Sequence, residues 1–161
     1  MGVPDPKRGG VDYPEIGKVL QVRDSPGYTV PFDCILLGCA GVEYGYGYSQ
    51  GYISLVRNGS TIFGRGNWDS FVDQYIVDAK EGDILHGSTW DYATVSYWRF
   101  LGPPDAIIKD NNGTVLTHAA MSNPTAYYRA ESIGTIDCNV YSPKGKKLGS
   151  TSYAFYESVP A

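Results

Sequence analysis

The stretch Tyr52–Phe63, "YISLVRNGSTIF", carries the strongest short-range fold signal in this chain of 161 residues. Two runs suited to β-strands, 52–57 and 60–63, flank the pair Asn58-Gly59. Asn and Gly tolerate the positive φ angles that a two-residue hairpin turn requires. The stretch therefore predicts a β-hairpin. The triplets "NGS" here and "NGT" at 112–114 also match glycosylation acceptors, but the sequence shows no secretory signal, and we interpret both as hairpin turns.

Further strand candidates follow one another closely on both sides of this hairpin. The segment 28–40 contains "CILLGCA", an apolar run typical of a strand that is buried on both faces. The segment 92–102, "YATVSYWRFLG", alternates between polar and apolar residues as a half-buried strand does. Shorter candidates lie at 16–23, 71–78 and 84–86. No window shows helical spacing of apolar residues with caps, so the prediction is an all-β, antiparallel sandwich.

Composition divides the chain into three parts. Residues 1–15 are rich in Gly, Pro and charge, and they predict an extended N-terminal arm. Residues 16–103 hold the seven candidate strands of the sandwich. Gly102-Pro103-Pro104 interrupts the pattern, and residues 104–161 then resume it with a second Asn-Gly turn and two further runs. We therefore expect 104–161 to form a C-terminal β-rich extension or subdomain.

The charge balance argues against nucleic acid as a partner. The net charge is −4 and the sequence pI is about 5.0, whereas proteins that bind phosphate backbones usually carry a basic patch. The only basic clusters, Lys7-Arg8 and Lys144–Lys147, lie in turn-like sequence. No run approaches the roughly 20 apolar residues of a membrane span. We therefore expect that the chain does not insert into a membrane. We also expect that it is synthesised in a cytoplasm.

The sequence does not indicate catalysis. His86 and His118 stand outside any metal-ligand spacing, no nucleophile elbow or dinucleotide fingerprint occurs, and the carboxylates are scattered. Cys34 and Cys39 would lie on opposite faces of one strand, and the third cysteine, Cys138, leaves an odd count. We expect three reduced, mostly buried thiols, no metal site, no cofactor, no catalytic residue and no enzyme.

One end of the predicted sandwich is unusually aromatic. Successive antiparallel strands reverse direction, so the connections "GVEYGYGYSQG", "GRGNWDS" and "GSTWDY" should emerge at the same end. The opposite end holds the tight turns "DSPG", "RNG" and "AKEGD". The aromatic residues that this argument gathers are Tyr44, Tyr46, Tyr48, Trp68, Trp90 and Tyr92.

Two interpretations of these aromatic residues stay open. Tyr44, Tyr46 and Tyr48 are spaced by two, so they could extend the strands, cover the mouth of the sandwich or pack against a neighbouring subunit. They could equally form a binding surface, because Tyr and Trp combine apolar faces with a polar group and dominate interfaces. We take all six residues as candidate receptor-binding residues.

Four short phrases stand out between residues 3 and 101: "PD" at 4–5, "YTVPFD" at 28–33, "VRNG" at 56–59 and "VDAKEGD" at 77–83. Together they resemble the C-terminal tip domains of bacteriophage tail-fibre and receptor-binding proteins. Those domains often open with a "PDY"-like phrase, continue with "YTAP-x-DG" into a buried strand, and then show a "VNG" hairpin and a "V-x-KGD" turn. The matching positions are Pro4-Asp5, Tyr28–Asp33, Val56–Gly59 and Val77–Asp83. The resemblance covers roughly residues 3–101. It departs at Asp33-Cys34, where the family has Asp-Gly, and at 104–161, which extend beyond the tip.

The resemblance implies a jelly-roll-like sandwich, a homotrimer, association with other virion tail or fibre proteins and attachment to a bacterial surface glycan or protein. It implies location in the virion after synthesis in the host cytoplasm, and it supplies no catalytic residue. Two other classes remain as alternatives: a purely structural virion decoration or connector protein, and a non-catalytic carbohydrate-binding module of a secreted or cell-surface enzyme.

Overall fold

The computed structural model describes residues 7–8, 11–20, 22, 26–42, 50–67, 71–90, 94–116, 118–120 and 128–160. Within these ranges the regular elements are all β-strands, and no helix is long and apolar enough to cross a membrane. The strands are β1 (Lys7–Arg8), β2 (Val11–Asp12), β3 (Tyr28–Thr29), β4 (Cys34–Val42), β5 (Gln50–Arg57), β6 (Ser60–Asn67), β7 (Phe71–Ala79), β8 (Ile84–Trp90), β9 (Thr94–Gly102), β10 (Ile107–Lys109), β11 (His118–Ala120), β12 (Tyr128–Tyr141) and β13 (Lys147–Pro160).

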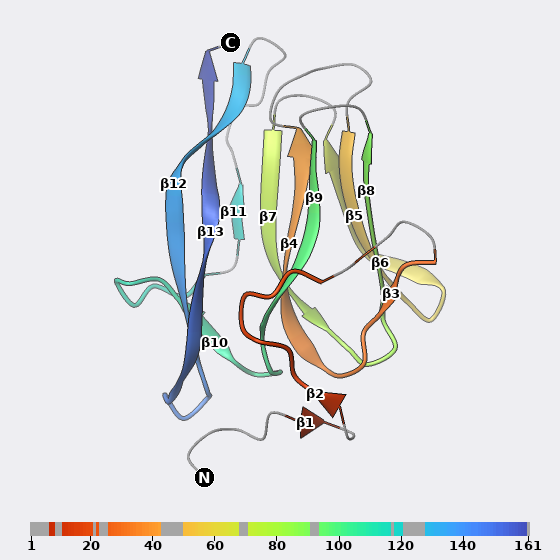
Figure 1. Cartoon of the computed structure of the whole chain (residues 1–161), viewed down its shortest axis with the longest axis vertical. Helices are drawn as coiled ribbons and strands as arrows, with labels where there is room; N and C mark the ends of the chain where they lie inside the picture. The colour runs from red at the N-terminus through yellow and green to blue at the C-terminus, as the bar shows by residue number, and fades with distance from the viewer. Residues whose placement is uncertain are drawn as a thin grey trace.

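Three antiparallel sheets stack as layers, which follow one another from right to left in Figure 1 as the outer, the central and the C-terminal sheet. The outer sheet has the strand order β3-β8-β5-β6, the central sheet β11-β7-β4-β9, and the C-terminal sheet β10-β12-β13. The short pair β1-β2 lies near the N-terminus. The antiparallel sandwich predicted from the sequence is therefore present, and a third layer covers its central sheet.

The outer sheet is built on the predicted hairpin. Arg57 pairs with Ser60 across the two-residue turn, and Asn58 and Gly59 have φ angles of 51° and 80°. Both values lie in the region that a type I′ turn requires and that Asn and Gly tolerate best. Strand β8 then pairs with the other edge of β5. The strongest local signal in the sequence is thus confirmed as a turn.

Strand β4 is the centre of the molecule and is buried on both faces, as its apolar sequence predicts. Side chains alternate across a strand, so Cys34, Leu36 and Ala40 face the outer sheet, and Ile35 and Leu37 face the C-terminal sheet. The first group packs in the sandwich core around Trp98 and Phe100. The second group packs in a separate core.

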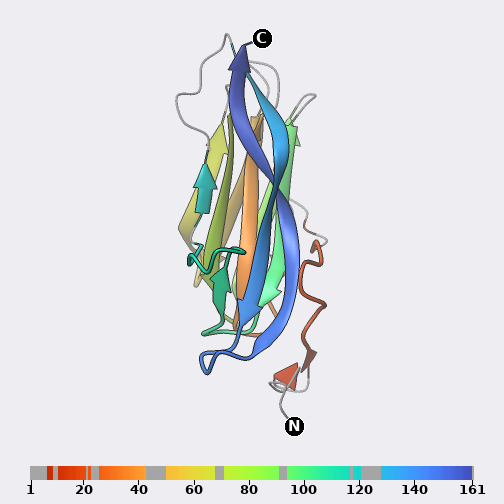
Figure 2. The same ribbon diagram turned by 90° about the vertical axis from the view of Figure 1, so that its left-hand side faces the viewer.

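The C-terminal sheet supplies the other half of that second core. Cys138 and Val140 from β12 and Tyr153 from β13 are buried against the central sheet. The guanidinium of Arg99 on β9 reaches across the layers, and its Nη1 donates to the Ser152 carbonyl over 2.8 Å. Part of segment 104–161 is therefore packed onto the sandwich rather than separate from it. Figure 2 shows the strongly twisted β12-β13 ribbon in front of the sheets.

Segment 16–23 differs from the predicted strand. Its described residues form only one isolated bridge, Val19 with Arg99, at the edge of β9. Backbone hydrogen bonds nevertheless follow β9, from Gly17 N to Phe100 O and from Leu20 N to Trp98 O, each over 2.8 Å. Residues 17–20 therefore act as an irregular edge strand of the central sheet.

The predicted continuous strand 28–40 is broken in the structure. Its first part, β3, belongs to the outer sheet, and β4 belongs to the central sheet. Between them Pro31 has no N–H to donate to a ladder. Val30 instead exchanges backbone bonds with the turn before β8, through Val30 N to Asp83 O and Gly82 N to Val30 O. The chain thus crosses from one sheet to the other at this point.

All three cysteines are buried and free of disulfide bonds. Burial in first place raises the pKa of Cys34 to about 12, with Asp33, Asp83 and Asp78 adding to the effect. Burial, assisted by Asp137 and opposed by Arg99, likewise raises the pKa of Cys138 to about 12. Because the thiolate is the reactive form, these pKa values disfavour the reactive form of both side chains at neutral pH. The expected burial of the cysteines is confirmed.

Candidate functional site

Three chain connections leave the sandwich at one end, which we call the loop end. They run from β4 to β5, from β6 to β7 and from β8 to β9. In the central sheet, Val42 pairs with Phe71, and Gly41 pairs with Val95. In the outer sheet the strand ends meet in the same way, because Gln50 pairs with Trp90. The six strand ends therefore gather at the same end of the molecule (Figure 1).

Gly51 brings the two sheets close together at the loop end. A Cβ atom at this position would collide with the backbone oxygens of Val95 and Gly41, and it would lie 2.9 Å from the Gly41 nitrogen. Glycine in a strand often marks such a close approach of a second backbone. The three connections are therefore anchored on strand ends that lie in direct contact across the sandwich.

Most of the predicted aromatic residues lie outside the described residues. Tyr44, Tyr46 and Tyr48 belong to 43–49, Trp68 to 68–70 and Tyr92 to 91–93. The sixth, Trp90, was expected in a connection, but it is the last residue of β8 and its backbone pairs with Gln50. Its side chain is not among those described. The structure thus places the strand ends that carry these connections, while the predicted role of their side chains stays a prediction.

A second feature lies on the flank of the sandwich between β6 and β7. The guanidinium carbon of Arg65 lies 4.7 Å from the centre of the Phe63 ring and 4.9 Å from the centre of the Tyr75 ring. The two rings meet edge to face, with centroids 5.4 Å apart. We call these three residues the Arg65 cluster. Arg65 is exposed, and its Nη1 donates to the neighbouring Gly64 carbonyl.

The Arg65 cluster can bind an anion beside an apolar surface. The guanidinium lies within cation–π distance of both rings, which are tilted by 71° to each other, and its remaining N–H donors can bind a carboxylate or a phosphate. Sequence reasoning missed the cluster because Tyr75 comes from a different sheet than Phe63 and Arg65. The available signal was the alternation of β6, which places Phe63 and Arg65 on one face; nothing local pointed to Tyr75.

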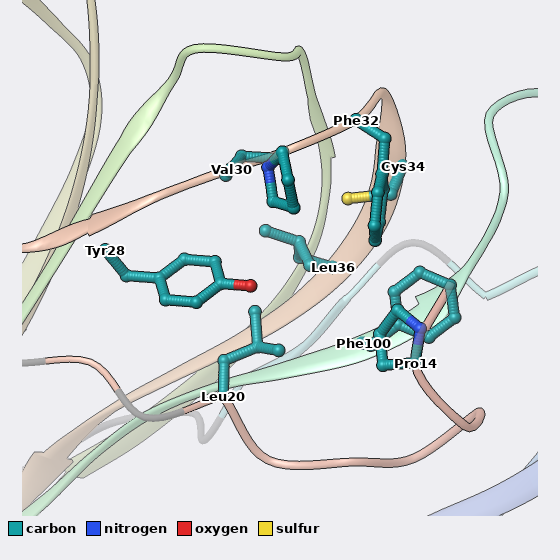
Figure 3. Close-up of a pocket in the computed structure, with 9 residues that line it drawn as sticks. Pro14, Leu20, Tyr28, Val30, Phe32, Cys34, Leu36 and Phe100 are labelled. Atoms are coloured by element: carbon teal, nitrogen blue, oxygen red, sulfur yellow. The ribbon is translucent and has the colours of Figure 1, made fainter. Parts of the chain in front are cut away.

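A small apolar pocket opens at the opposite flank, beside β3. Figure 3 shows the Tyr28 hydroxyl and the Cys34 sulfur directed toward its interior. The pocket has room for about one water molecule. Burial, followed by the neighbouring Cys34, raises the pKa of Tyr28. A space this small cannot hold an organic ligand, so we regard it as a packing feature. Its lining comprises Pro14, Leu20, Tyr28, Val30, Pro31, Phe32, Cys34, Leu36 and Phe100.

The end opposite the loop end is closed by a buried ion pair. Arg57 donates from Nε and Nη2 to the two carboxylate oxygens of Asp83, each over 2.8 Å, and Asp83 is 1% exposed. The Lys80 backbone N–H adds a bond of 2.7 Å to Asp83. Glu81 N donates to Asp33 over 2.9 Å. The aspartates of the phrases "VPFD" and "AKEGD" therefore hold turns together.

The described side chains give no support for metal chemistry. Within the described ranges no three His, Cys, Asp or Glu side chains lie close enough together to hold a metal ion. The expectation of no catalysis remains a prediction. We found no match for the chain among protein-family models, curated proteins or solved structures.

Proposed function

We propose that this chain is an attachment domain of a virion fibre, in which a jelly roll presents its loop end to a glycan or protein on a bacterial surface. The observation that carries the proposal is the gathering of three connections at one end. Their sequences hold Tyr44, Tyr46, Tyr48, Trp68 and Tyr92, and Trp90 ends the neighbouring strand. The other end is closed by the Arg57–Asp83 pair. The turns at that other end, "RNG" and "AKEGD", are short and carry no aromatic residue.

The strand order supports the jelly roll. Counting residues 17–20 as the first strand, the following strands β3, β4 and β5 alternate between the central and outer sheets, and β6 stays beside β5. Strands β7, β8 and β9 alternate again. This gives eight strands in two sheets, with orders 17–20, β9, β4, β7 and β3, β8, β5, β6, as two interleaved Greek keys produce, and β11 is added at the free edge of β7.

The chemistry of the loop end suits a saccharide. Aromatic rings cover the apolar face of a sugar while their polar groups hydrogen-bond at the edge. Arg65 lies two residues before the end of β6 and adds a cation to the flank of this surface. That placement favours a glycan that carries carboxylate or phosphate groups. We further propose assembly as a homotrimer with other tail or fibre proteins, which would multiply weak single-site binding.

The test compares Tyr46→Ala and Trp90→Ala with the unmodified chain in binding to host cell envelopes. Each truncation should cost about 2 kcal/mol, or roughly a thirtyfold loss of affinity per site. The thermal midpoint and the oligomeric state should hold. The matched control is Tyr141→Ala, which removes an aromatic ring from the C-terminal sheet, away from the loop end, and should leave binding unchanged.

Three outcomes would contradict the proposal. If Tyr46→Ala lowers the thermal midpoint by many degrees or dissociates the oligomer, the rings pack within or between subunits. If the unmodified chain sits in the virion but fails to bind envelopes, a decoration or connector role replaces attachment. A lone monomer with affinity for free sugars would instead favour a carbohydrate-binding module.

A further inference from the structure

The β12-β13 ribbon leaves two strand edges open. Among the strands that the structure describes, β13 is the terminal strand of its sheet and pairs with β12 alone. Strand β12 pairs on its other side with β10, but only over Asn139–Tyr141. Among the described residues, no strand pairs with the second edge of β12 from Tyr128 to Cys138. Open N–H and C=O groups on a long strand are a template for pairing with another chain.

The backbone groups of the open β13 edge can be assigned. In an antiparallel pair, successive residues alternate between pointing toward the partner strand and away from it. The Ser152 carbonyl accepts from Arg99 in the central sheet, which places Ser152 among the residues that point away from β12. The register of β13 runs without an inserted residue from Gly149 to Pro160. Ala154, Tyr156 and Ser158 therefore present their backbone N–H and C=O to the open edge.

From 150 to 159 this edge lacks the usual protection against pairing, and the one proline of β13, Pro160, is its last residue. In natural proteins, edge strands avoid pairing with another chain because they contain lysine, proline or a bulge, or because they are short. The sequence 150–159, "STSYAFYESV", has one charged residue, Glu157, and no proline. The single irregularity in this part of the ribbon lies on β12, between Ser132 and Gly134. Nothing in 150–159 therefore opposes the addition of a strand.

The ribbon also extends past the strands that support it. In Figures 1 and 2 the first part of β12 and the last part of β13 rise beyond the ends of β4, β7 and β9 at the loop end. An isolated two-stranded ribbon is at best marginally stable in water, and a third strand or a packed face is needed. The projecting part is thus suited to receive a partner strand.

We propose that the ribbon is the interface between copies of this chain, with β13 of one copy pairing antiparallel with β12 of the next. The ribbon offers two open edges that run in opposite directions. Around a threefold axis along the ribbon, each β13 lies antiparallel to the next copy's β12, and the third copy closes the ring. Closure removes every open edge of the projecting ribbons. A twofold β13–β13 contact would leave both β12 edges open.

This inference rests on the trimer in the proposed function and adds the strands that form it. The ring of paired β12 and β13 strands lies beside the loop end. A trimer formed in this way would therefore bring the loop ends of its three copies together around one axis. The first test is light scattering on Ser158→Pro, which removes one N–H from the open edge without breaking a bond to β12. The control is Ser158→Ala, which keeps that N–H.

The expected result is a trimer of about three times 17.6 kDa for the unmodified chain and for Ser158→Ala. Ser158→Pro should shift to the monomer mass, with the β-type circular dichroism of the sandwich retained. An unmodified monomer would overturn both the trimer and this interface. A trimer that survives Ser158→Pro would overturn the interface alone. If the unmodified chain is a trimer that does not bind host cell envelopes, the interface stands and the attachment role is contradicted.

Cysteine cross-linking keeps the proposal testable should Ser158→Pro fail to fold. Ser158→Cys is co-expressed with Tyr128→Cys, Ala130→Cys or Ser132→Cys, carried on separately tagged chains, and then oxidised. At least one combination should give a covalent dimer of the two tags, while each variant alone should give none. Self-linking of Ser158→Cys would indicate a twofold contact. Absence of cross-linking in all three combinations would equally overturn the interface.

Discussion

Removal of the Arg57 side chain should destabilise the fold strongly and in a pH-dependent way. The Asp83 side chain is 1% exposed in the unmodified chain, and the Arg57→Ala substitution removes both of its guanidinium donors while keeping the bond from Lys80 N. Breaking a buried ion pair by deleting one partner costs about 3–5 kcal/mol. The Arg57 side chain is itself 35% exposed, so water can partly replace it, and we expect a loss of about 3 kcal/mol.

The pH dependence follows from the pKa of Asp83. Burial alone would raise this pKa. The hydrogen bonds from the Arg57 side chain and the Lys80 backbone N–H, together with the positive charges of these two side chains, outweigh burial and lower the pKa. A carboxyl group with a lowered folded-state pKa adds stability above its unfolded pKa near 3.9, and this stability is lost as the pH falls through the folded value. Without Arg57, burial dominates and the pKa of Asp83 should rise. The stability difference between the two chains should therefore shrink as the pH falls from 7 toward 4.

The assay is thermal unfolding of Arg57→Ala and of the unmodified chain at several pH values. A loss of about 3 kcal/mol corresponds to a fall in midpoint of roughly 6–12 °C for a chain of this size. The control is Arg65→Ala, which removes an exposed arginine and its ring contacts and should cost about 1 kcal/mol or less. A midpoint within 2 °C of the unmodified chain at pH 7, or a difference that grows on acidification, would refute the reasoning.

Two further predictions concern the core. Gly38→Ala should lower the free energy of unfolding by about 1–3 kcal/mol, because its Cβ would lie 2.6 Å from Ile53 Cδ1 and 2.8 Å from Trp98 Cζ3. Gly64→Ala, where the nearest atom is the movable Tyr52 hydroxyl at 3.1 Å, is the control in the same unfolding assay, and equal losses would contradict this reading. The thiols should resist alkylation in the native state at pH 8, because burial raises the pKa of two of them to about 12. After alkylation in denaturant, mass spectrometry should find three modified thiols, on Cys34, Cys39 and Cys138. Rapid alkylation of the native chain would contradict this prediction and show that the cores open.

Local signals predicted the elements that depend on local physics. The turn at Asn58-Gly59 follows from the φ angles that these two residues tolerate, and no distant contact is needed to form it. The double burial of β4 follows from a run without a single charged side chain. The gathering of three connections at one end follows from strand direction alone. The first two features are encoded within about a dozen neighbouring residues, and the third needs only the alternating direction of successive antiparallel strands.

Other features depend on partners that are distant in the sequence. The break between β3 and β4 reflects backbone bonds from Val30 to the turn at Gly82 and Asp83. The Arg65 cluster needs Tyr75 from another sheet. In each case residues brought together across sheets decide the outcome, and a sequence pattern does not specify which sheets meet.

The sequence by itself determined the β class, the turn at Asn58-Gly59 and the doubly buried central strand, because turn chemistry and side-chain alternation act within a few residues. Only the tertiary structure decided that part of 104–161 forms a third layer over the central sheet. Both faces of β4 are apolar, so a covering layer was required, but any amphipathic sheet could have supplied it. Burial of Cys138, Val140 and Tyr153 against Ile35 and Leu37 is what selects this one. The hydrophobic effect sets how much apolar surface must be covered, and packing across distant strands determines which residues cover it.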